Sequence, residues 1–353
     1  MATFYELAEK AIALERAGKK IIRLNIGDAN LPAPDVAKEA VCKSVRNSPT
    51  GYGSSAGMFE LRQEIARREK CGVENVVVGP GSKHLLFALM STLCRQGETL
   101  AFPSPYWPAY ELACRQLGLN VAAAKATLGK NWQFDSLPKA KLSIICNPLN
   151  PTSTIYDAGK INAAIDEANA SGSHVILDEA YKGIAFEKIP EYEGALRVRS
   201  FSKEFNMENW RLGYLVAPPE IVQKVVKFNQ ITETCVPPFV QSAGIACLQN
   251  EKELLDANRR IWKIRADVAA RALRKAGFKF AAPQAPMYAF ATHEGITDAG
   301  EYAMKLLEER GVAVAPGNDF GGFAKFVRIT LNQEEEVLEG AIEKMGETAS
   351  AES

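Results

Sequence analysis

Histidine is scarce in this sequence, and its scarcity limits the chemistry that the chain's own side chains can perform. Only three histidines occur among 353 residues. His84, His174 and His293 lie far apart and lack the spacing of metal ligands. Isolated structural or surface roles are therefore the simplest interpretation. A zinc site or a Ser-His-Asp triad has little support, so catalysis by this chain would need an organic cofactor.

Paired cysteines are also lacking. The seven cysteines form no CxxC motif and show no paired spacing. Some of them, such as Cys146 in "LSIICNP", have apolar neighbours in the sequence. An odd and scattered set of this kind predicts free thiols in a reducing compartment. We therefore expect a cytoplasmic protein.

The chain has neither an excess of one charge nor a long apolar run. Lys+Arg and Asp+Glu are balanced at 42 each, so no net field would attract nucleic acid or an anionic membrane. Apolar runs stay far below the roughly 20 residues that span a bilayer. The first twenty residues, "MATFYELAEKAIALERAGKK", predict an amphipathic helix and contain no signal-peptide core. Partners among nucleic acids and membranes are not expected.

What the sequence does contain is a hydrophobic share of 47% and an alternation of strand and helix patterns. Apolar runs typical of buried strands occur at 75–81, 98–105, 141–148, 173–180, 196–202 and 211–218. Between them, apolar residues recur at three- and four-residue spacing, as in a helix. This alternation predicts an α/β fold with a mostly parallel sheet that helices cover on both faces.

The two ends of the chain differ from this middle part. From residue 251 a long helical pattern is followed by strand-like runs at 278–283, 287–294, 312–317 and 325–331, with further helices. We therefore predict a large domain at 46–250 and a smaller α+β domain at 251–353. The segment 1–45 is expected to join the smaller domain.

Four strand ends carry polar groups, and ligands bind beyond the carboxyl ends of strands in open α/β sheets. The first is "VVVGPGSKHLL", where the amides of Gly81, Ser82 and Lys83 could hold an anion at a helix N-terminus. The run matches neither a dinucleotide fingerprint nor a P-loop. An ordinary tight turn is the alternative.

The next two strand ends carry amide and carboxylate side chains. "ICNPLNPTST" places Asn147 and Asn150 in a turn that prolines enforce, and both can be simple turn formers. "VILDEAY" places Asp178 at the end of an apolar strand. A carboxylate buried there is costly unless it faces a cation. Capping of the following helix is the alternative role.

The fourth strand end is "LRVRSFSK", with Lys203 in small and apolar surroundings and Arg211 eight residues later. Desolvation disfavours the ammonium form of such a lysine, and a neutral amine is what attacks a carbonyl to form a Schiff base. A lone lysine is more often at the surface. The anion cradle, the carboxylate and the lysine together match the phosphate, ring nitrogen and aldehyde of pyridoxal 5'-phosphate.

At this point the chain resembles the fold-type I pyridoxal-phosphate enzymes of the class I/II aminotransferases, and most of all their aspartate/aromatic branch. The resemblance runs almost from end to end. Its motifs are "LNIGDANLPAP", "YGSSAGMFELR", "GPGSKHLLFAL", "PSPYWPAY", "NPLNPTS", "LDEAY", "SFSKEFNMENWRLGY" and "PGNDFGGFAKFVRITL". It implies a seven-stranded sheet in the large domain and a homodimer that shares its active sites.

The resemblance also implies a role for each matching residue. Lys203 would bond covalently to the cofactor, and Asp178 would pair with its ring nitrogen. Tyr181 and Asn150 would hydrogen-bond its phenolic oxygen, and Trp107 would stack on its ring. The phosphate contacts would come from Ser82, Lys83, Ser200, Ser202 and Arg211, with Tyr52 supplied by the neighbouring subunit.

Substrate binding is implied in the same way. Arg328 would hold the α-carboxylate of the substrate, helped by Gly27 and Asn150. Taken alone, Tyr52, Trp107 and Arg328 would fit packing or surface roles as well. Lys83 is our candidate for a second carboxylate, because a cation at a helix start is disfavoured unless an anion lies nearby. It could also simply face solvent.

Two positions depart from the family's pattern. The usual "NPTG" reads "NPTS", so Ser153 stands in place of a glycine, and "QAPMYAF" lacks the usual glycine before the aromatic strand. The expected reaction is a ping-pong amino transfer from an L-amino acid, aspartate first and aromatic residues second, to an acceptor such as 2-oxoglutarate. A C–S β-lyase, a decarboxylase or an aminocyclopropane-forming enzyme on the same scaffold is the first alternative. A cofactor-sensing regulator without catalysis is the second.

Overall fold

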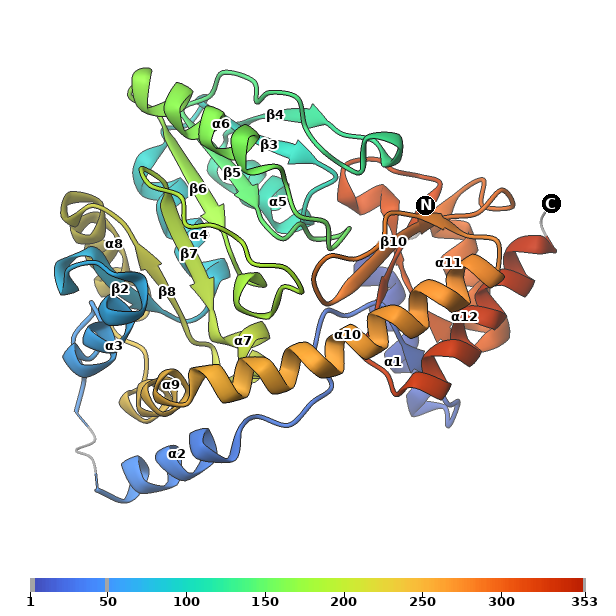
Figure 1. Cartoon of the computed structure of the whole chain (residues 1–353), viewed down its shortest axis with the longest axis horizontal. Helices are drawn as coiled ribbons and strands as arrows, with labels where there is room; N and C mark the ends of the chain where they lie inside the picture. Colours follow the sequence, from blue (N-terminus) through green and yellow to red (C-terminus); the bar gives the residue numbers. More distant parts are fainter. Residues whose placement is uncertain (1–3, 48–50, 352–353) are drawn as a thin grey trace.

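A seven-stranded sheet forms the centre of the molecule (Figure 1). The computed structural model describes residues 4–47 and 51–351. The strand order is β2-β8-β7-β6-β5-β3-β4. β8 runs antiparallel to both of its neighbours, and the other pairs are parallel. The expected α/β class with a mostly parallel sheet is confirmed.

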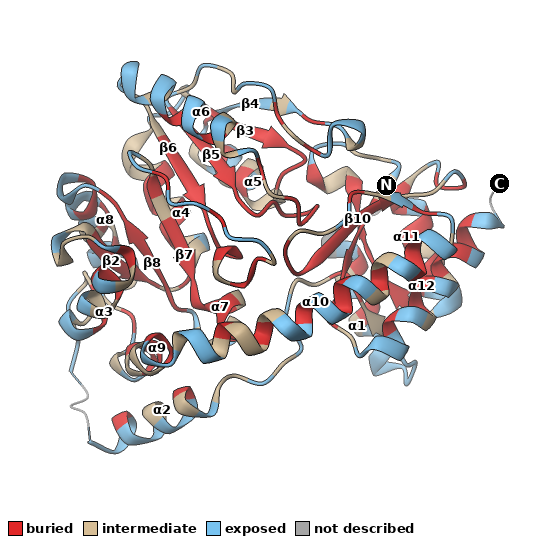
Figure 2. Ribbon diagram, viewed as in Figure 1, coloured by how far each residue is buried: buried red, intermediate tan, exposed pale blue. Residues whose placement is uncertain are grey.

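The strands of this sheet follow the apolar runs of the sequence. They are β2 (Val76–Gly79), β3 (Thr99–Ser104), β4 (Asn120–Lys125), β5 (Leu142–Cys146), β6 (His174–Asp178), β7 (Leu196–Ser200) and β8 (Gly213–Val216). Figure 2 shows the inner strands as buried. β4 is the one that the periodicity did not predict. It lies at the sheet edge with exposed residues and three consecutive alanines, which pack weakly as strand residues.

Helices lie on both faces of the sheet, as continuously apolar strands require. In Figure 1, α6 lies in front of the sheet, and α4 and α5 lie behind it. The helices of this part are α3 (Phe59–Glu69), α4 (Ser82–Leu93), α5 (Pro108–Leu117), α6 (Ala158–Ala170), α7 (Phe201–Glu204), α8 (Pro219–Thr232) and α9 (Pro238–Gln249). Short 3-10 turns are η1 (Val73–Asn75), η2 (Leu128–Lys130), η3 (Lys182–Ile184) and η4 (Glu208–Trp210).

A second group of strands forms from the two ends of the chain. β12 (Ala315–Pro316), β13 (Phe326–Thr330), β10 (Tyr288–Thr292) and β9 (Lys279–Phe280) make an antiparallel sheet in that order. β1 (Ile22–Arg23) pairs with β11 (Val312–Ala313). The helices α1 (Phe4–Arg16), α11 (Ala299–Arg310) and α12 (Glu335–Ser350) pack around them, with the 3-10 turn η5 (Gly317–Phe320).

Two helices connect these parts. α2 (Asp35–Asn47) packs against α9 beside the central sheet, although α1 and β1 before it contact the carboxy-terminal strands. α10 (Glu251–Lys275) begins near α9 and runs as far as α12, across the front of Figure 1. The domain bounds at 45 and 250 stay a prediction.

The carboxy-terminal end differs from the sequence pattern. The polar residues "GETASAES" predict a frayed tail, but α12 continues to Ser350. Met345, Thr348 and Ala349 are buried, and Gly346 packs so closely on α10's end that a Cβ would lie 2.8 Å from the Cβ of Ala276. Small residues allow this close approach of the two helices. Residues 352 and 353 lie outside the described part.

Candidate functional site

Two adjoining cavities lie between the carboxyl ends of the central strands and the smaller sheet. The outer one encloses about 550 Å³ and the inner one about 510 Å³, within the usual range for small-molecule sites. The residues that line both of them are Lys83, Trp107, Asn150, Tyr181 and Lys203. All four of the predicted strand ends therefore meet at one place.

The register of the parallel strands explains this convergence. β5 and β6 pair Cys146 with Asp178, so the two strands end together. β6 and β7 pair Asp178 with Val198, so β7 ends only two residues further, at Ser200. Because parallel neighbours share one carboxyl edge, the polar residues that follow each strand face the same space.

Asp178 is a fully buried acid in the inner cavity. The phenol of Tyr110 donates to its Oδ2 at 2.6 Å, and the amide of Ala180 approaches its Oδ1 at 3.4 Å. Burial raises the pKa of Asp178 to about 6, against the lowering effect of these two donors. Among the described residues, no cationic side chain forms an ion pair with it. The side chain therefore presents an anionic acceptor that a bound cation would stabilise.

The amino end of α4 forms one wall of the inner cavity. α4 has no side-chain cap and no acidic residue in its first turn, and its N-cap Gly81 has φ +88°. A Cβ at Gly81 would lie 2.5 Å from Nη2 of Arg211, so only glycine lets that guanidinium come this close. Ser82, Ser200, Ser202 and Arg211 all line the cavity. The structure therefore brings the residues predicted to bind an anion to one wall of the inner cavity.

Lys203 lies in α7, a single helical turn directly after β7, and not on the strand itself. Ser200 starts this turn, because its hydroxyl accepts a hydrogen bond from the amide of Ser202 at 3.2 Å. The Lys203 side chain is 16% exposed. Its Nζ donates to the carbonyl of Gly27 and lies 3.6 Å from a carboxylate oxygen of Glu208. The surroundings are thus more polar than the sequence predicted.

A buried ion cluster supports α7 from behind. The carboxylate of Glu204, next to Lys203 in the chain, accepts from Arg199 at 2.8 Å, from Arg68 at 2.9 Å and from the amide of Gly183 at 2.9 Å. Burial opposes its ionisation, yet the two arginines lower the pKa of Glu204. The same two arginines hold the pKa of nearby Glu69 at about 2 in spite of burial. Sequence analysis missed this cluster, and the charges inside the apolar strand "LRVRS" were its only signal.

Arg328, on β13, faces the outer cavity and is buried. Its Nη1 donates to Oδ1 of Asn150 at 3.2 Å and its Nη2 to the carbonyl of Asn25 at 2.6 Å. The guanidinium lies 4.4 Å from the ring centroid of Tyr288. Gly27 lines the same cavity, and a Cβ there would lie 2.1 Å from the Tyr288 hydroxyl. The three residues predicted to bind the α-carboxylate, Gly27, Asn150 and Arg328, therefore line one cavity together.

Lys83 and Trp107 lie at the boundary of the two cavities. The Lys83 Nζ lies 5.0 Å from the centroid of the Trp107 ring. Burial, followed by the positive charges of Arg211 and Lys203, lowers the pKa of Lys83. A bound anion would relieve this repulsion among the three cations.

Tyr52 is not among the residues that line either cavity. Its side chain is 90% exposed, and it lies in the loop before α3. Residues 48–50, which precede it in the loop "NSPTGYGSS", lie outside the described residues. In the single chain, the Tyr52 side chain therefore faces outward.

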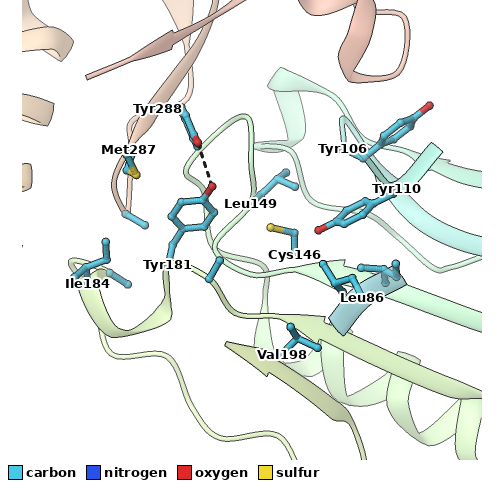
Figure 3. Close-up of a cluster of buried hydrophobic side chains, with 14 of the residues drawn as sticks. Leu86, Tyr106, Tyr110, Cys146, Leu149, Tyr181, Ile184, Val198, Met287 and Tyr288 are labelled. Atoms are coloured by element: carbon cyan, nitrogen blue, oxygen red, sulfur yellow. Dashed lines mark hydrogen bonds between the residues drawn. The ribbon is translucent and has the colours of Figure 1, made fainter. Parts of the chain in front are cut away.

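Tyr110, Tyr288 and Glu208 are further site residues that sequence analysis did not select. Figure 3 shows the Tyr181 and Tyr288 side chains pointing toward one another from two different segments. The motif "PSPYWPAY" contained Tyr110, and its spacing of three from Trp107 on a helix start was the available signal. Tyr288 gave no such signal, because its partner Tyr181 is distant in the sequence. Glu208 lies five residues after Lys203 in the motif "SFSKEFNMENWRLGY", and that closeness was its available signal.

These features fit pyridoxal 5'-phosphate. Asp178 offers a buried anion to a protonated ring nitrogen, and the α4 start with Arg211 offers donors to a phosphate. Lys203 lines both cavities between them. A metal site is not found, since in the part of the chain that the structure covers no three His, Cys, Asp or Glu side chains gather to hold an ion. No helix of that part is long and apolar enough to cross a membrane.

Comparisons with known proteins agree with this geometry. The family described as "Aminotransferase class I and II" matches residues 19–345. An aspartate aminotransferase of Thermococcus kodakarensis is 35% identical over 88% of this chain and 84% of its own length. An aspartate/prephenate aminotransferase of Thermus thermophilus is 27% identical over 95% and 92%. A solved structure, the Thermus thermophilus aspartate aminotransferase with maleate, superposes with a TM-score of 0.91 at 27% identity and covers 99% of this chain and 97% of that one.

The unpaired burial of Asp178 can be tested by measuring protein stability as a function of pH. In the cofactor-free protein its pKa is raised from 3.8 to about 6, so the folded state holds this proton more tightly than the unfolded chain. The favourable contribution of protonated Asp178 to the free energy of unfolding is complete below pH 4 and is lost as the pH rises through 6. A shift of about two pH units corresponds to about 3 kcal/mol.

Asp178→Asn removes the charge and keeps an acceptor for Tyr110. We expect the cofactor-free variant to be more stable than the wild type by about 2–3 kcal/mol at pH 8 and similar to it at pH 4. Urea denaturation at both pH values measures the difference. Equal stability of the two proteins at pH 8 would show that Asp178 is not isolated from cations.

Proposed function

The chain belongs to the class I and II aminotransferase family and depends on pyridoxal 5'-phosphate, and we propose that it moves the amino group of aspartate to a 2-oxo acid such as 2-oxoglutarate. The observation that carries the choice of aspartate is a pair of cations, Arg328 and Lys83, lining one cavity of about 550 Å³. Aspartate has two carboxylates. The relatives with aspartate in their names, and the one solved with the dicarboxylate maleate, support this choice.

When bound, the cofactor supplies an electron-accepting ring that stabilises the charge left on the substrate's α-carbon after its proton is removed. Lys203 would attach the cofactor through Nζ and, once displaced, would take that proton. Asp178 would keep a proton on the ring nitrogen by its negative charge. The hydrogen bond from Tyr110 at 2.6 Å would hold the Asp178 carboxylate in place.

The remaining cofactor contacts follow from the cavity walls. Tyr181 and Asn150, 3.4 Å apart between Oη and Nδ2, would bind the phenolic oxygen. Trp107 would cover one ring face. The phosphate donors would be Ser82, Lys83, Ser200, Ser202 and Arg211, all of which line the inner cavity.

Substrate orientation would depend on Arg328. The neighbouring Asn150 and Asn25 hold two of its guanidinium nitrogens, so the group is preorganised for a planar carboxylate. The backbone of Gly27 would approach the same carboxylate. Because every α-amino acid carries this carboxylate, Arg328 alone would not select aspartate, and Lys83 would bind the second one.

We also propose a homodimer in which Tyr52 reaches the partner's phosphate. The loop that carries Tyr52 is anchored, because Gly53 N donates to Cys235 Sγ at 3.2 Å and Asn229 Nδ2 donates to the Ser55 carbonyl at 3.1 Å. Tyr52 and Ile231 nevertheless are 90% and 83% exposed. An anchored loop with outward apolar side chains is typical of a surface that a second copy covers.

We propose a cytoplasmic location, because the cysteines of this chain are free thiols. All seven cysteines are free, and three of them are buried. Burial raises the pKa of Cys114 and of Cys247 to about 12, so these thiols are protonated and unreactive. Such thiols persist in a reducing compartment.

The covalent role of Lys203 can be measured directly. Lys203→Ala removes both the attachment and the proton acceptor, so we expect the visible absorbance of bound cofactor to change and turnover to fall by at least about 100-fold. The exposed Lys224, changed to Ala, is a matched control that should keep both properties. Full transamination by the Lys203 variant would refute the assignment.

Substrate choice is tested at Lys83. Lys83→Ala should raise the KM for aspartate about 10- to 100-fold, the usual cost of a lost charged hydrogen bond. The KM for alanine, which lacks the second carboxylate, should stay nearly constant. Steady-state kinetics with both donors provide the comparison. An equal loss with both would mean that Lys83 serves the phosphate alone.

Site sharing is tested by mixing two weakened variants, Tyr52→Phe and Arg328→Ala. Each mixed dimer would contain one intact site, with Arg328 from one subunit and Tyr52 from the other. If subunits assort at random, activity should recover to about a quarter of the wild-type value per protein. No recovery after confirmed exchange, or a fully active monomer in solution, would contradict the shared site.

A further inference from the structure

Ser153 occupies an unusual place in the turn that follows β5. It is fully buried, and its φ is +56°, in the left-handed region that favours glycine. Its amide donates to the carbonyl of Leu149 at 2.7 Å. A buried side chain in a conformation that disfavours side chains indicates that the surrounding structure uses it.

The partners of Ser153 are in a segment more than 130 residues away. Its carbonyl accepts from the amides of Gln284 at 2.9 Å and Ala285 at 3.1 Å. Its hydroxyl accepts from the amide of Tyr288 at 2.9 Å. The side chain of Gln284 accepts in turn from the amide of Ile155 at 3.0 Å. The turn after β5 is therefore joined to the start of β10, and the Ser153 hydroxyl holds the backbone of Tyr288.

Tyr288 extends from this anchored backbone into the site. Its hydroxyl lies 3.1 Å from the hydroxyl of Tyr181, the contact drawn as a dashed line in Figure 3. Its ring lies against the guanidinium of Arg328, with 4.4 Å from the ring centroid to the guanidinium carbon. The side chain is 2% exposed. It touches one residue proposed for the cofactor and one proposed for the substrate.

The other contacts close a ring of four side chains. Arg328 donates to Asn150 at 3.2 Å, and Asn150 Nδ2 donates to Tyr181 Oη at 3.4 Å. Tyr181 and Tyr288 share a hydrogen bond, and Tyr288 returns to Arg328 through its ring. Each member is therefore held from two sides. Removing the Tyr288 hydroxyl opens the ring at one point and leaves its aromatic contact in place.

We propose that Tyr288 is a positioning residue, which donates its hydroxyl proton to Tyr181 and thereby links the substrate-binding arginine to the cofactor, and that Ser153 orients it. This inference rests on the roles proposed for Tyr181 and Arg328. Tyr181 has one proton, and binding the cofactor's phenolic oxygen uses it. The hydrogen bond between the two phenols then requires Tyr288 as its donor.

The direction of the effect follows from this assignment of protons. A hydrogen bond received by Tyr181 polarises its O–H and makes it a stronger donor. A stronger donor stabilises negative charge on the phenolic oxygen, and this lowers the proton affinity of the nitrogen that joins Lys203 to the cofactor. The charged side chains that line the two cavities around this region are Lys83, Glu111, Arg115, Asp178, Lys203, Glu208, Arg211, Asp319 and Arg328.

The test is a pH titration of the visible absorbance of the cofactor-loaded enzyme. Tyr288→Phe should move the midpoint upward by about half a pH unit, the scale expected for cooperative strengthening of one charged hydrogen bond. Ser153→Ala should move it in the same direction, because the backbone of Tyr288 loses its anchor. Tyr156→Phe is the matched control, since the described residues offer no partner to that buried hydroxyl, and its midpoint should equal the wild-type value.

Steady-state kinetics provide the second measurement. Tyr288→Phe keeps the ring against Arg328, so we expect kcat to fall several-fold while the KM for aspartate stays within about twofold. An unchanged midpoint, or a downward shift in Tyr288→Phe, would overturn the inference even if the enzyme transaminates normally. A wild-type enzyme without any pH-dependent visible absorbance would overturn the cofactor roles proposed above together with this inference.

Discussion

The site depends on a carboxylate that the fold buries without a cation. Asp178 ends β6 at the point where β5 also ends, and its neighbours are a phenol, an amide and apolar side chains. Burial of an unpaired charge is costly, and here the cost raises the pKa of Asp178 to about 6. A protonated ring nitrogen bound beside Asp178, as we propose, would remove that cost, and the relief would favour cofactor binding.

Positioning of Lys203 follows a different principle. Lys203 stands on one turn of helix, which is too short to be stable alone, and the cluster of Glu204, Arg199 and Arg68 behind it supplies the support. On the opposite side, the carbonyl of Gly27 accepts from its ammonium. An otherwise weak element is therefore held between a buried ion cluster and the amino-terminal segment, and its lysine lines both cavities.

Much of the fold was predictable, because its strands are continuous apolar runs between helices. All six apolar runs formed strands of the central sheet, and the smaller sheet arose from the runs near 280, 290, 315 and 328. β4 escaped prediction because an exposed edge strand of alanines shows no period. The polar residues at the carboxy-terminal end suggested a frayed tail, yet they continue α12, which packs against α10 and α11, and Thr348 and Ala349 are buried. In both places the local sequence pattern was a poor guide to contacts with distant parts of the chain.

The groups that follow the strands of the central sheet can be read from the sequence alone: the glycine turn at Gly81, the acid at 178 and the lysine at 203. These can be read because strand ends in a parallel sheet share one edge. Arg328 lies within β13 and was predicted from the family resemblance. Which of the side chains touch one another depends on the tertiary structure. Tyr288 meets Tyr181 and Tyr110 binds Asp178 across large sequence separations. Such contacts depend on how two sheets pack, and side-chain packing leaves no periodic pattern along the chain.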